Sequence, residues 1–194
     1  MRIIAGLAKG RNISAVAEST RPTSDRAREA LFSSLASEFG DFDGLNVLDL
    51  YAGTGAIGLE ALSRGSSTVH CVESDERAAQ AIFSNYESIK SSQFPGIFHL
   101  YSMSVDRFLE NPAPMQYHFI YVDPPYEFSD IDIIENLIAI VDGNFLHPDG
   151  LIAVERNSRV KELSWPYGLE QLRDKKYGQA TIFFGVPTLE MDLD

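Results

Sequence analysis

The sequence predicts an α/β fold with a mixed sheet that ends in an antiparallel hairpin. Short apolar runs rich in Val, Ile and aromatic residues alternate with helical patterns, as in βαβ units around a parallel sheet. The pattern changes near the end, where residues 170–176 and 180–184 flank Tyr177-Gly178-Gln179, a sequence typical of a hairpin turn. With 194 residues and 44% hydrophobic content, the chain is long enough for one well-packed core.

A small N-terminal extension is expected before the first core strand. Gly6 and Gly10, together with the polar residues between positions 12 and 20, permit an irregular hairpin or arm. Ser24 can cap a helix that has Asp25 in its first turn. The apolar side of this helix consists of Ala27, Ala30, Leu31 and Leu35.

Strands and helices are expected to alternate through the rest of the chain. Apolar runs predict strands near residues 46–50, 68–72, 97–101, 117–122 and 150–155. Helices are expected between them, at about residues 56–63, 76–89, 105–110 and 131–141. Because no repeat or linker interrupts this order, residues 1–194 are expected to form a single domain, with an arm and helix at 1–40 and a core at 41–194.

The composition predicts a cytoplasmic protein. The single cysteine, Cys71, lies inside an apolar run, which is typical of a small buried side chain rather than of a disulfide or a metal ligand. The apolar run at the start is too short for a signal peptide. No later segment approaches the length of a membrane span.

The charge distribution is compatible with a nucleic-acid partner despite a formal net charge of −12. Residues 1–28 contain six basic and two acidic residues, and residues 156–176 contain six and three. The interval 29–155 contains four basic and twenty acidic residues. If the two basic segments converge in space, they form a rim that can neutralise phosphates; the alternative is that they are ordinary solvated faces.

A glycine-rich turn follows the first predicted core strand. Residues 47–58 read as a buried strand, a turn with the spacing G-x-G-x-x-G and the start of a helix. Glu73 follows twenty residues after the first glycine of that motif, Gly53, at the end of the second strand. The same arrangement is the dinucleotide-binding fingerprint, so a nicotinamide-dependent oxidoreductase is one interpretation.

Asp49 favours a different ligand at this turn. A pyrophosphate is best bound by bare backbone N–H groups, whereas Asp49 places a carboxylate beside the turn. A ligand with an ammonium group, such as S-adenosylmethionine, would be stabilised by that acid, and Glu73 can accept hydrogen bonds from both ribose hydroxyls. The second interpretation is therefore an S-adenosylmethionine site.

The tetrapeptide Asp123-Pro124-Pro125-Tyr126 directly follows an apolar strand. Neither proline can donate to a sheet ladder, so the strand must stop there and its last polar groups are held outside the sheet. The Asp123 carboxylate and the Pro124 carbonyl offer two acceptors for an exocyclic amine, and Tyr126 offers a face for stacking on a flat base. The pattern predicts methylation of an amino nitrogen; a simple strand-ending turn is the alternative.

Other chemistries find less support in the sequence. The four histidines show no paired metal-ligand spacing, so no metal is expected. No nucleophile elbow or matching set of Ser, His and acid indicates a hydrolase. The histidines are His70, His99, His118 and His147.

With both motifs in view, the chain resembles the RsmD family, the 16S rRNA guanine-N2 methyltransferases. The similarity runs from Met1-Arg2-Ile3-Ile4-Ala5-Gly6 to Gly150-Leu151-Ile152-Ala153-Val154-Glu155. The glycine turn and the Asp-Pro-Pro-Tyr motif occur in many methyltransferases. The block at residues 21–32, Arg-Pro-Thr-Ser-Asp-Arg-Ala-Arg-Glu-Ala-Leu-Phe, is much more specific for this family.

The resemblance implies a Rossmann-like methyltransferase fold with a seven-stranded sheet, in which residues 1–40 contact RNA. It implies S-adenosylmethionine as the cofactor and a guanine of 16S rRNA, free or in the assembled small ribosomal subunit, as the target. A monomer without a metal or a membrane contact is expected. Within enzymes, an adenine-N6 or glutamine-N5 methyltransferase would share the Asp-Pro-Pro-Tyr chemistry; outside enzymes, a non-catalytic RNA-binding module is the alternative.

Site residues follow from the motifs and from the resemblance. Catalysis is expected from Asp123, Pro124 and Tyr126. Contacts with the substrate are expected from Pro125, Arg21, Thr23, Arg26 and Arg28. The last four could instead line the mouth of the cofactor site, and surface charges and a helix cap would also explain them. Contacts with the cofactor are expected from Asp49, Tyr51, Gly53, Thr54, Gly55, Glu73, Ser74 and Ser104. Ser104 stands where such enzymes often place an acidic or amide residue against adenine.

Overall fold

Alternating strands and helices confirm the predicted α/β fold. The computed structural model describes residues 1–14, 25–125 and 127–188. Its strands form a mixed seven-stranded sheet with an antiparallel C-terminal hairpin, as the sequence predicts. The chain divides into two compact units, Met1–Phe108 and Leu109–Asp194. The expected single domain with a boundary near residue 40 stays a prediction.

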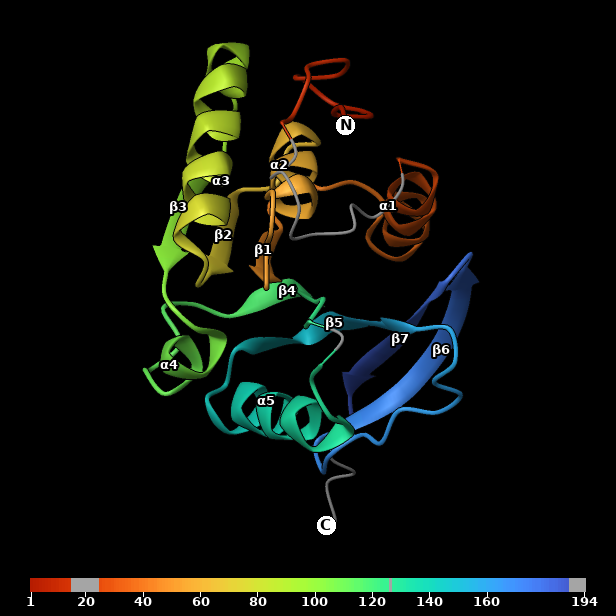
Figure 1. Ribbon diagram of the computed structural model, residues 1–194. Helices are drawn as coiled ribbons and strands as arrows, with labels where there is room; N and C mark the ends of the chain where they lie inside the picture. Colours follow the sequence, from red (N-terminus) through yellow and green to blue (C-terminus); the bar gives the residue numbers. More distant parts are fainter. Residues whose placement is uncertain (15–24, 126, 189–194) are drawn as a thin grey trace. The chain divides into compact units, whose positions relative to one another are not determined.

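The first unit contains two successive βαβ crossovers (Figure 1). Its strands lie in the order β3-β2-β1 and pair in parallel, so their carboxyl ends meet at one edge. The register pairs Asp49 with Cys71 and Glu73 with Ser102. The elements are α1 (Asp25–Phe39), β1 (Asn46–Leu50), α2 (Ala56–Ser63), β2 (Thr68–Glu73), α3 (Glu76–Ile89), the 3₁₀ turn η1 (Lys90–Ser92), β3 (Ile97–Ser102) and α4 (Val105–Leu109).

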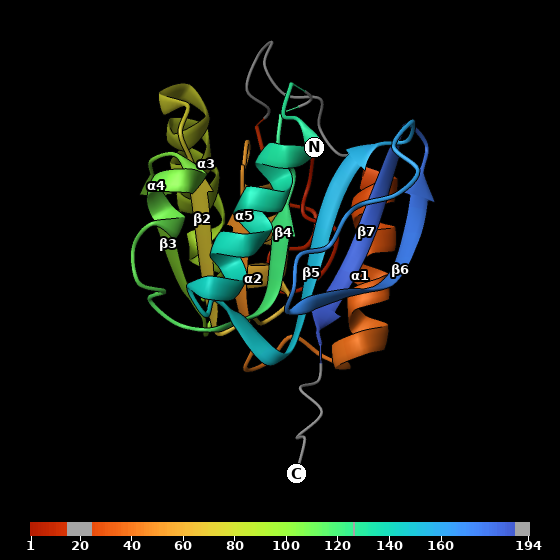
Figure 2. The ribbon, with the colours of Figure 1, turned by 90° about the horizontal axis from the view of Figure 1, so that it is seen from below.

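The second unit has the strand order β4-β5-β7-β6. The β4–β5 pair is parallel, while β7 pairs antiparallel with both β5 and β6. Helix α5 lies against one face of the β4–β5 pair (Figure 2). The elements are β4 (Tyr117–Val122), α5 (Asp130–Asp142), β5 (Leu146–Asn157), β6 (Leu169–Tyr177) and β7 (Ala180–Pro187).

Strand β5 begins four residues before its expected start near Gly150. Leu146 pairs with Tyr117, and the next paired residue, Leu151, pairs with Phe119, so the strand contains an irregularity between these pairs. The sequence His147-Pro148-Asp149-Gly150 has the composition of a turn, so its residues do not predict that the strand already starts before this irregular stretch. Propensity alone therefore places the start of this strand too late.

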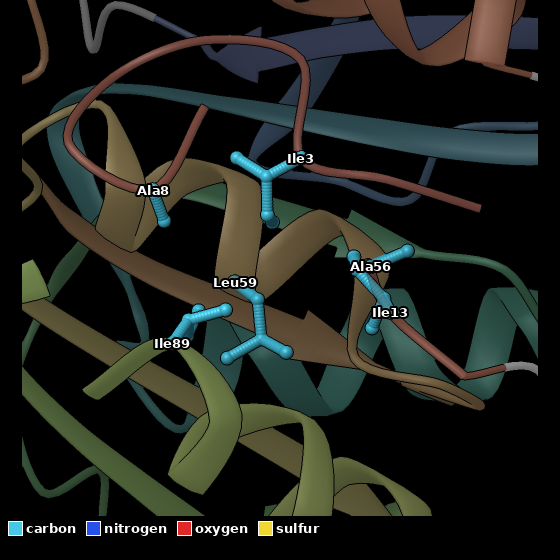
Figure 3. Packing of buried hydrophobic residues seen from close by; sticks show 6 residues of the cluster. All are labelled: Ile3, Ala8, Ile13, Ala56, Leu59 and Ile89. Carbon is cyan, nitrogen blue, oxygen red and sulfur yellow. The ribbon is translucent and has the colours of Figure 1, made fainter. Parts of the chain in front are cut away.

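The N-terminal arm is a short hairpin that packs on α2 and α3 of its own unit (Figure 3). The Ile3 N–H donates to the Arg11 carbonyl at 2.9 Å, and Arg2 forms a bridge with Asn12. Gly6 permits the close approach, because its φ is +81° and a Cβ there would lie 1.8 Å from the Ser63 carbonyl oxygen. The predicted irregular hairpin is thus confirmed for the described part of the arm.

Apolar side chains attach this arm to the rest of the first unit. The cluster unites three residues of the arm with two of α2 and one of α3, all 9% exposed or less; they are Ile3, Ala8, Ile13, Ala56, Leu59 and Ile89 (Figure 3). Burial of such side chains stabilises by about 1.5–3 kcal/mol for each large aliphatic group. The arm is consequently a structural part of the unit that contains the glycine turn.

Among the helices within residues 1–14, 25–125 and 127–188, none has the length and apolar character needed to cross a membrane.

Candidate functional site

The glycine turn, residues 51–55, joins β1 to α2. Tyr51, Gly53 and Gly55 all have positive φ, at 58°, 55° and 73°. Positive φ costs glycine little, whereas a tyrosine there is uncommon and marks a constrained position. The Ala52 N–H donates to the Val72 carbonyl at 3.0 Å, which attaches the turn to the end of β2. The sequence motif therefore forms the tight strand-to-helix turn that the spacing predicts.

Glu73 connects the end of β2 to this turn. Its Oε2 accepts from the Gly53 N–H at 2.7 Å, and its Oε1 accepts from the Asp75 N–H at 2.8 Å. Each carboxylate oxygen has a second lone pair, so the group can still accept from ribose hydroxyls. Ser74, which follows, is exposed. The sequence indicated Glu73 as a ligand of a nucleoside, but not its bond to the turn.

Asp49 lies beneath the turn and is only 2% exposed. Its Oδ2 accepts from the Gly58 N–H at 2.9 Å and lies 3.9 Å from the Cys71 sulfur. Burial, together with the nearby charge of Glu73, raises the pKa of Asp49 to about 8, although the bond from Gly58 opposes the shift. The carboxyl group thus fixes the first turn of α2; its predicted contact with an ammonium group stays a prediction.

Two neighbours explain why the glycine motif extends to Gly58. A Cβ at Gly58 would lie 2.5 Å from the Cys71 sulfur and 3.0 Å from a Val69 methyl carbon. Only a residue without a side chain lets α2 approach β2 this closely. Cys71 is fully buried, which confirms its interpretation as a small apolar side chain.

The Asp49→Asn variant should gain stability relative to the wild type as the pH rises from about 4 to about 8. The folded-state pKa of about 8 exceeds the ordinary aspartate pKa of 3.8, so only the unfolded chain ionises in this window. The wild type therefore loses stability by up to about 1.4 kcal/mol per pH unit, whereas Asn cannot ionise. Urea unfolding of both proteins at several pH values measures this difference, and a pH-independent difference would contradict the buried, protonated state.

Two further predicted cofactor residues have different surroundings. Thr54 is 6% exposed, and its carbonyl accepts from the Asn85 side-chain amide at 3.1 Å. Ser104 is exposed, and its hydroxyl accepts from the Arg107 N–H at 3.3 Å at the start of α4. That bond is typical of a helix cap, and contact of Ser104 with adenine stays a prediction. Asn85, which the sequence analysis did not single out, proves to be a partner of the turn.

The groups at this edge of the sheet fit S-adenosylmethionine as a ligand. Gly53 and Gly55 leave the turn without side chains, and Glu73 supplies a carboxylate at the end of the neighbouring strand. A nucleoside with a ribose diol needs an acceptor of this kind, here held at a turn whose glycines are buried and have no side chains. Ligands of this chemical class are bound outside the carboxyl ends of strands in open α/β sheets.

The Asp-Pro-Pro motif belongs to the second unit, directly after β4. Asp123 is half-buried, Pro124 is buried and Pro125 is exposed, whereas Tyr126 lies outside the described residues. The Pro125 carbonyl accepts from the Phe128 N–H at 3.0 Å. The strand ends where the prolines predict, and the turn that follows is hydrogen-bonded.

Arg156 holds the segment that follows this motif. Its Nη2 donates to the Phe128 carbonyl at 3.2 Å and to Asp130 Oδ1 at 3.0 Å. Because Arg156 is part of β5, it ties the loop after Pro125 to the neighbouring strand. The segment is thereby restrained from the β5 side.

Of the predicted RNA contacts, Arg26 and Arg28 lie within the described residues, and Arg21 and Thr23 do not. Arg26 is exposed on α1, as a contact with phosphate requires. Arg28 is fully buried, donates to Asp25 Oδ1 at 3.0 Å and to the Arg2 carbonyl, and lies 3.9 Å from Glu60. Burial lowers the pKa of Arg28, while Glu60 and Asp25 oppose that shift. Its position favours a structural role in the N-terminal arm and argues against the predicted contact with RNA.

Glu60 is the centre of that buried polar cluster and was missed by the sequence analysis. Its carboxylate accepts from the Ile4 N–H at 2.8 Å, the Ala5 N–H at 3.0 Å and Arg64 Nε at 2.9 Å. It is completely buried on α2. A charged residue on an otherwise apolar helix was the available signal, since such residues are buried only when they are paired.

The chain is similar to known proteins along most of its length. A "Ribosomal RNA small subunit methyltransferase D" of Haemophilus influenzae is 34% identical over 183 residues, which cover 92% of this chain and 89% of that protein. YlbH of Bacillus subtilis, provisionally named an rRNA methyltransferase, is 34% identical over 181 residues, which cover 92% and 94%. The solved structure of Escherichia coli yhhF, provisionally described as a methyltransferase, has 28% identity and a TM-score of 0.81, with 95% of this chain and 96% of that chain covered.

A protein family described as "Conserved hypothetical protein 95" matches residues 1–186. This match and the named relatives cover both units, including the glycine turn and the Asp-Pro-Pro motif. The chain therefore belongs to this family, the RsmD family whose motifs the sequence displays.

Proposed function

We propose that the protein transfers a methyl group from S-adenosylmethionine to the exocyclic N2 amine of a guanine in small-subunit ribosomal RNA. The observation that carries this proposal is the match over both units to relatives named small-subunit rRNA methyltransferases. The glycine turn with Glu73 and the Asp-Pro-Pro strand end supply the two chemical halves that such a reaction requires.

Residues of the first unit bind the donor in this proposal. Glu73 accepts hydrogen bonds from the ribose hydroxyls, and the backbone of Gly53 and Gly55 lies against the methionyl and ribose portions. When bound, the donor supplies a methyl carbon activated by a positively charged sulfur, so the chain needs neither a covalent nucleophile nor a metal. Asp49 supports these contacts by holding the start of α2.

Residues of the second unit orient the accepting amine. The Asp123 carboxylate and the Pro124 carbonyl accept its two N–H groups, which fixes the orientation of the nitrogen lone pair for attack on a methyl carbon. A nitrogen–carbon bond forms as the carbon–sulfur bond breaks, which leaves S-adenosylhomocysteine, and the methylated amine then releases one proton to water. Asp123 acts mainly as an acceptor, because an ordinary carboxylate is a weak base. Tyr126 stacks on the guanine ring in this scheme.

The nicotinamide interpretation is disfavoured by the relatives, whose names describe methyl transfer to RNA. A thermal-shift comparison separates the two interpretations directly. S-adenosylhomocysteine should raise the unfolding temperature by mass action, whereas NAD should leave it unchanged. Stabilisation by NAD alone would reject the proposed donor.

The reaction is tested with labelled methyl donor and two substrates, free 16S rRNA and small subunits that lack the modification. Label should appear in N2-methylguanine after digestion to nucleosides, and comparison of the substrates shows whether the assembled subunit is required. Label in N6-methyladenine, or in a protein glutamine, would assign the chain to another amino-methyltransferase. The absence of transfer in the presence of donor binding would favour a non-catalytic RNA-binding module.

RNA recognition is assigned to the N-terminal arm and helix, and the Arg26→Glu variant tests it. Loss of one phosphate contact should weaken RNA binding and reduce the slope of log affinity against log salt by about 0.7–0.9. Affinity for S-adenosylhomocysteine should not change. Arg77→Glu makes the same charge change at an exposed residue on α3 and serves as the control. Equal RNA affinity of the Arg26→Glu variant and the wild type would remove Arg26 from the interface.

A monomer that works on ribosomal RNA in the cytoplasm, without a metal and without a membrane contact, is the arrangement we propose.

A further inference from the structure

Asn85 of α3 joins two segments that are far apart in the sequence. It is 3% exposed, and its Oδ1 accepts from the Ser14 N–H at 2.8 Å. Its Nδ2 donates to the Ser14 carbonyl at 3.1 Å and to the Thr54 carbonyl at 3.1 Å. One side chain therefore contacts both the N-terminal arm and the glycine turn.

These three bonds use the specific capacity of an asparagine amide. The side chain must both accept from one N–H and donate to two carbonyls, which fixes the orientation of its oxygen and nitrogen. An aspartate could keep the bond from Ser14 N–H but would place a carboxylate against two carbonyl oxygens. Alanine would leave the carbonyl of the buried Thr54 without this donor.

The two contacts of Asn85 lie at functionally distinct places. The Thr54 carbonyl belongs to the residue between Gly53 and Gly55, in the middle of the turn assigned to the donor. Ser14 is the last described residue before the segment that contains Arg21 and Thr23, which the resemblance assigns to RNA. Ser14 itself is exposed and is not among the residues assigned to the donor.

The rest of the arm is fixed independently of Asn85. Glu60 accepts from the Ile4 and Ala5 N–H groups, and Ser63 Oγ accepts from the Ala8 N–H at 3.0 Å. The arm therefore has its own anchors on α2. The Ser14–Asn85 bonds connect its end with the turn by hydrogen bonds, beside the packing of Ile13 in the cluster that contains Ala56.

We propose that Asn85 is a positioning residue that makes the geometry of the donor turn, and hence the affinity for the methyl donor, depend on the N-terminal arm. This inference rests on the proposed function, in which the turn binds S-adenosylmethionine. Because coupling between sites is reciprocal, binding of the donor also favours the attached position of the arm.

Two substitutions at Ser14, a residue that is not assigned to the methyl donor, test the inference. Ser14→Pro removes the N–H that donates to Asn85 and leaves Asn85 intact, whereas Ser14→Ala keeps the N–H and changes only an exposed side chain. Ser14→Pro should weaken binding of S-adenosylhomocysteine about fivefold, as expected for a net hydrogen-bond contribution of about 1 kcal/mol. The KM for the donor should rise by a similar factor, with kcat at saturating donor nearly unchanged.

The possible outcomes distinguish a role of Asn85 in positioning the turn from a role in protein stability alone. Weaker binding by Ser14→Pro together with wild-type binding by Ser14→Ala supports the inference. Equal affinity of the two variants overturns it, including the case in which both bind weakly or only the unfolding temperature falls. If the wild type does not bind S-adenosylhomocysteine at all, the proposed function has failed instead.

Asn85→Asp decides the question if Ser14→Pro does not fold. This variant keeps the bond from the Ser14 N–H and loses both donations to carbonyls. A folded protein with weakened binding of S-adenosylhomocysteine supports positioning, whereas wild-type affinity overturns it. Failure of both variants to fold also overturns it, because Asn85 would then be a requirement of the fold.

Discussion

Asp123→Ala should reduce methyl transfer by about 100-fold or more while the affinity for S-adenosylhomocysteine stays close to that of the wild type. The carboxylate follows β4 directly and is half-buried in the second unit, whereas the donor is assigned to the first unit. Removal of one preorganised polar group that acts on the reacting atoms commonly costs about 10²–10³ in kcat. Single-turnover rates with labelled donor, together with calorimetric titration of S-adenosylhomocysteine, measure the two quantities separately.

Two further variants serve to interpret the result of Asp123→Ala. Asp149→Ala removes a carboxylate that is 93% exposed in the same unit and should leave the rate unchanged. Asp123→Asn keeps one acceptor oxygen, so partial activity would support orientation of the amine over proton removal. If Asp123→Ala retains more than about a tenth of the wild-type rate, the proposed role of this residue is rejected.

Glu60→Gln should lower the free energy of unfolding by about 3–5 kcal/mol. The side chains of Glu60 and Arg28 are both completely buried and lie 3.9 Å apart, so neutralising Glu60 leaves the buried Arg28 guanidinium with the exposed carboxylate of Asp25 as its remaining described acidic partner. The same change weakens the acceptor of the Ile4 and Ala5 N–H groups, which hold the N-terminal arm. Urea unfolding, analysed at constant m-value, measures the loss.

A double substitution distinguishes the charge from the loss of packing. Adding Arg28→Met to Glu60→Gln removes the buried guanidinium charge and should recover part of the lost stability. Glu87→Gln affects an exposed ion pair with Lys90 in the same unit and should hardly move the urea midpoint. A Glu60→Gln protein as stable as Glu87→Gln would show that the buried ion pair contributes nothing to this fold.

Local patterns sufficed for most of the secondary structure, because each depends on neighbouring residues. The apolar runs at β1, β2 and β4 and the helical patterns of α2 and α3 stand in the structure where the periodicity predicts them. Strand β5 departs from this rule, since the bulge after Leu146 resembles a turn in composition. A bulge is stabilised by its partner strand, which local propensity does not contain.

The candidate site divides in the same way. Gly53, Gly55 and Glu73 were recognisable because a strand, a turn and a spacing of twenty residues define a known binding arrangement. The bond from Gly53 to Glu73 requires the parallel pairing of β1 and β2, and that from Gly58 to Asp49 requires α2 to pack against the end of β1. Such contacts are visible only once the strands are paired.

The sequence by itself determined the α/β class, the glycine turn, the strand end at Asp-Pro-Pro and the membership of the family. Only the tertiary structure decided that Arg28 lies buried near Glu60, and that Asn85 connects Ser14 with Thr54. These residues are separated by 31 or more positions along the chain, and no local pattern specifies which distant partner a polar side chain meets. The physical reason is that a buried charge or amide needs a hydrogen-bond partner, and the packing of distant elements decides which group lies close enough.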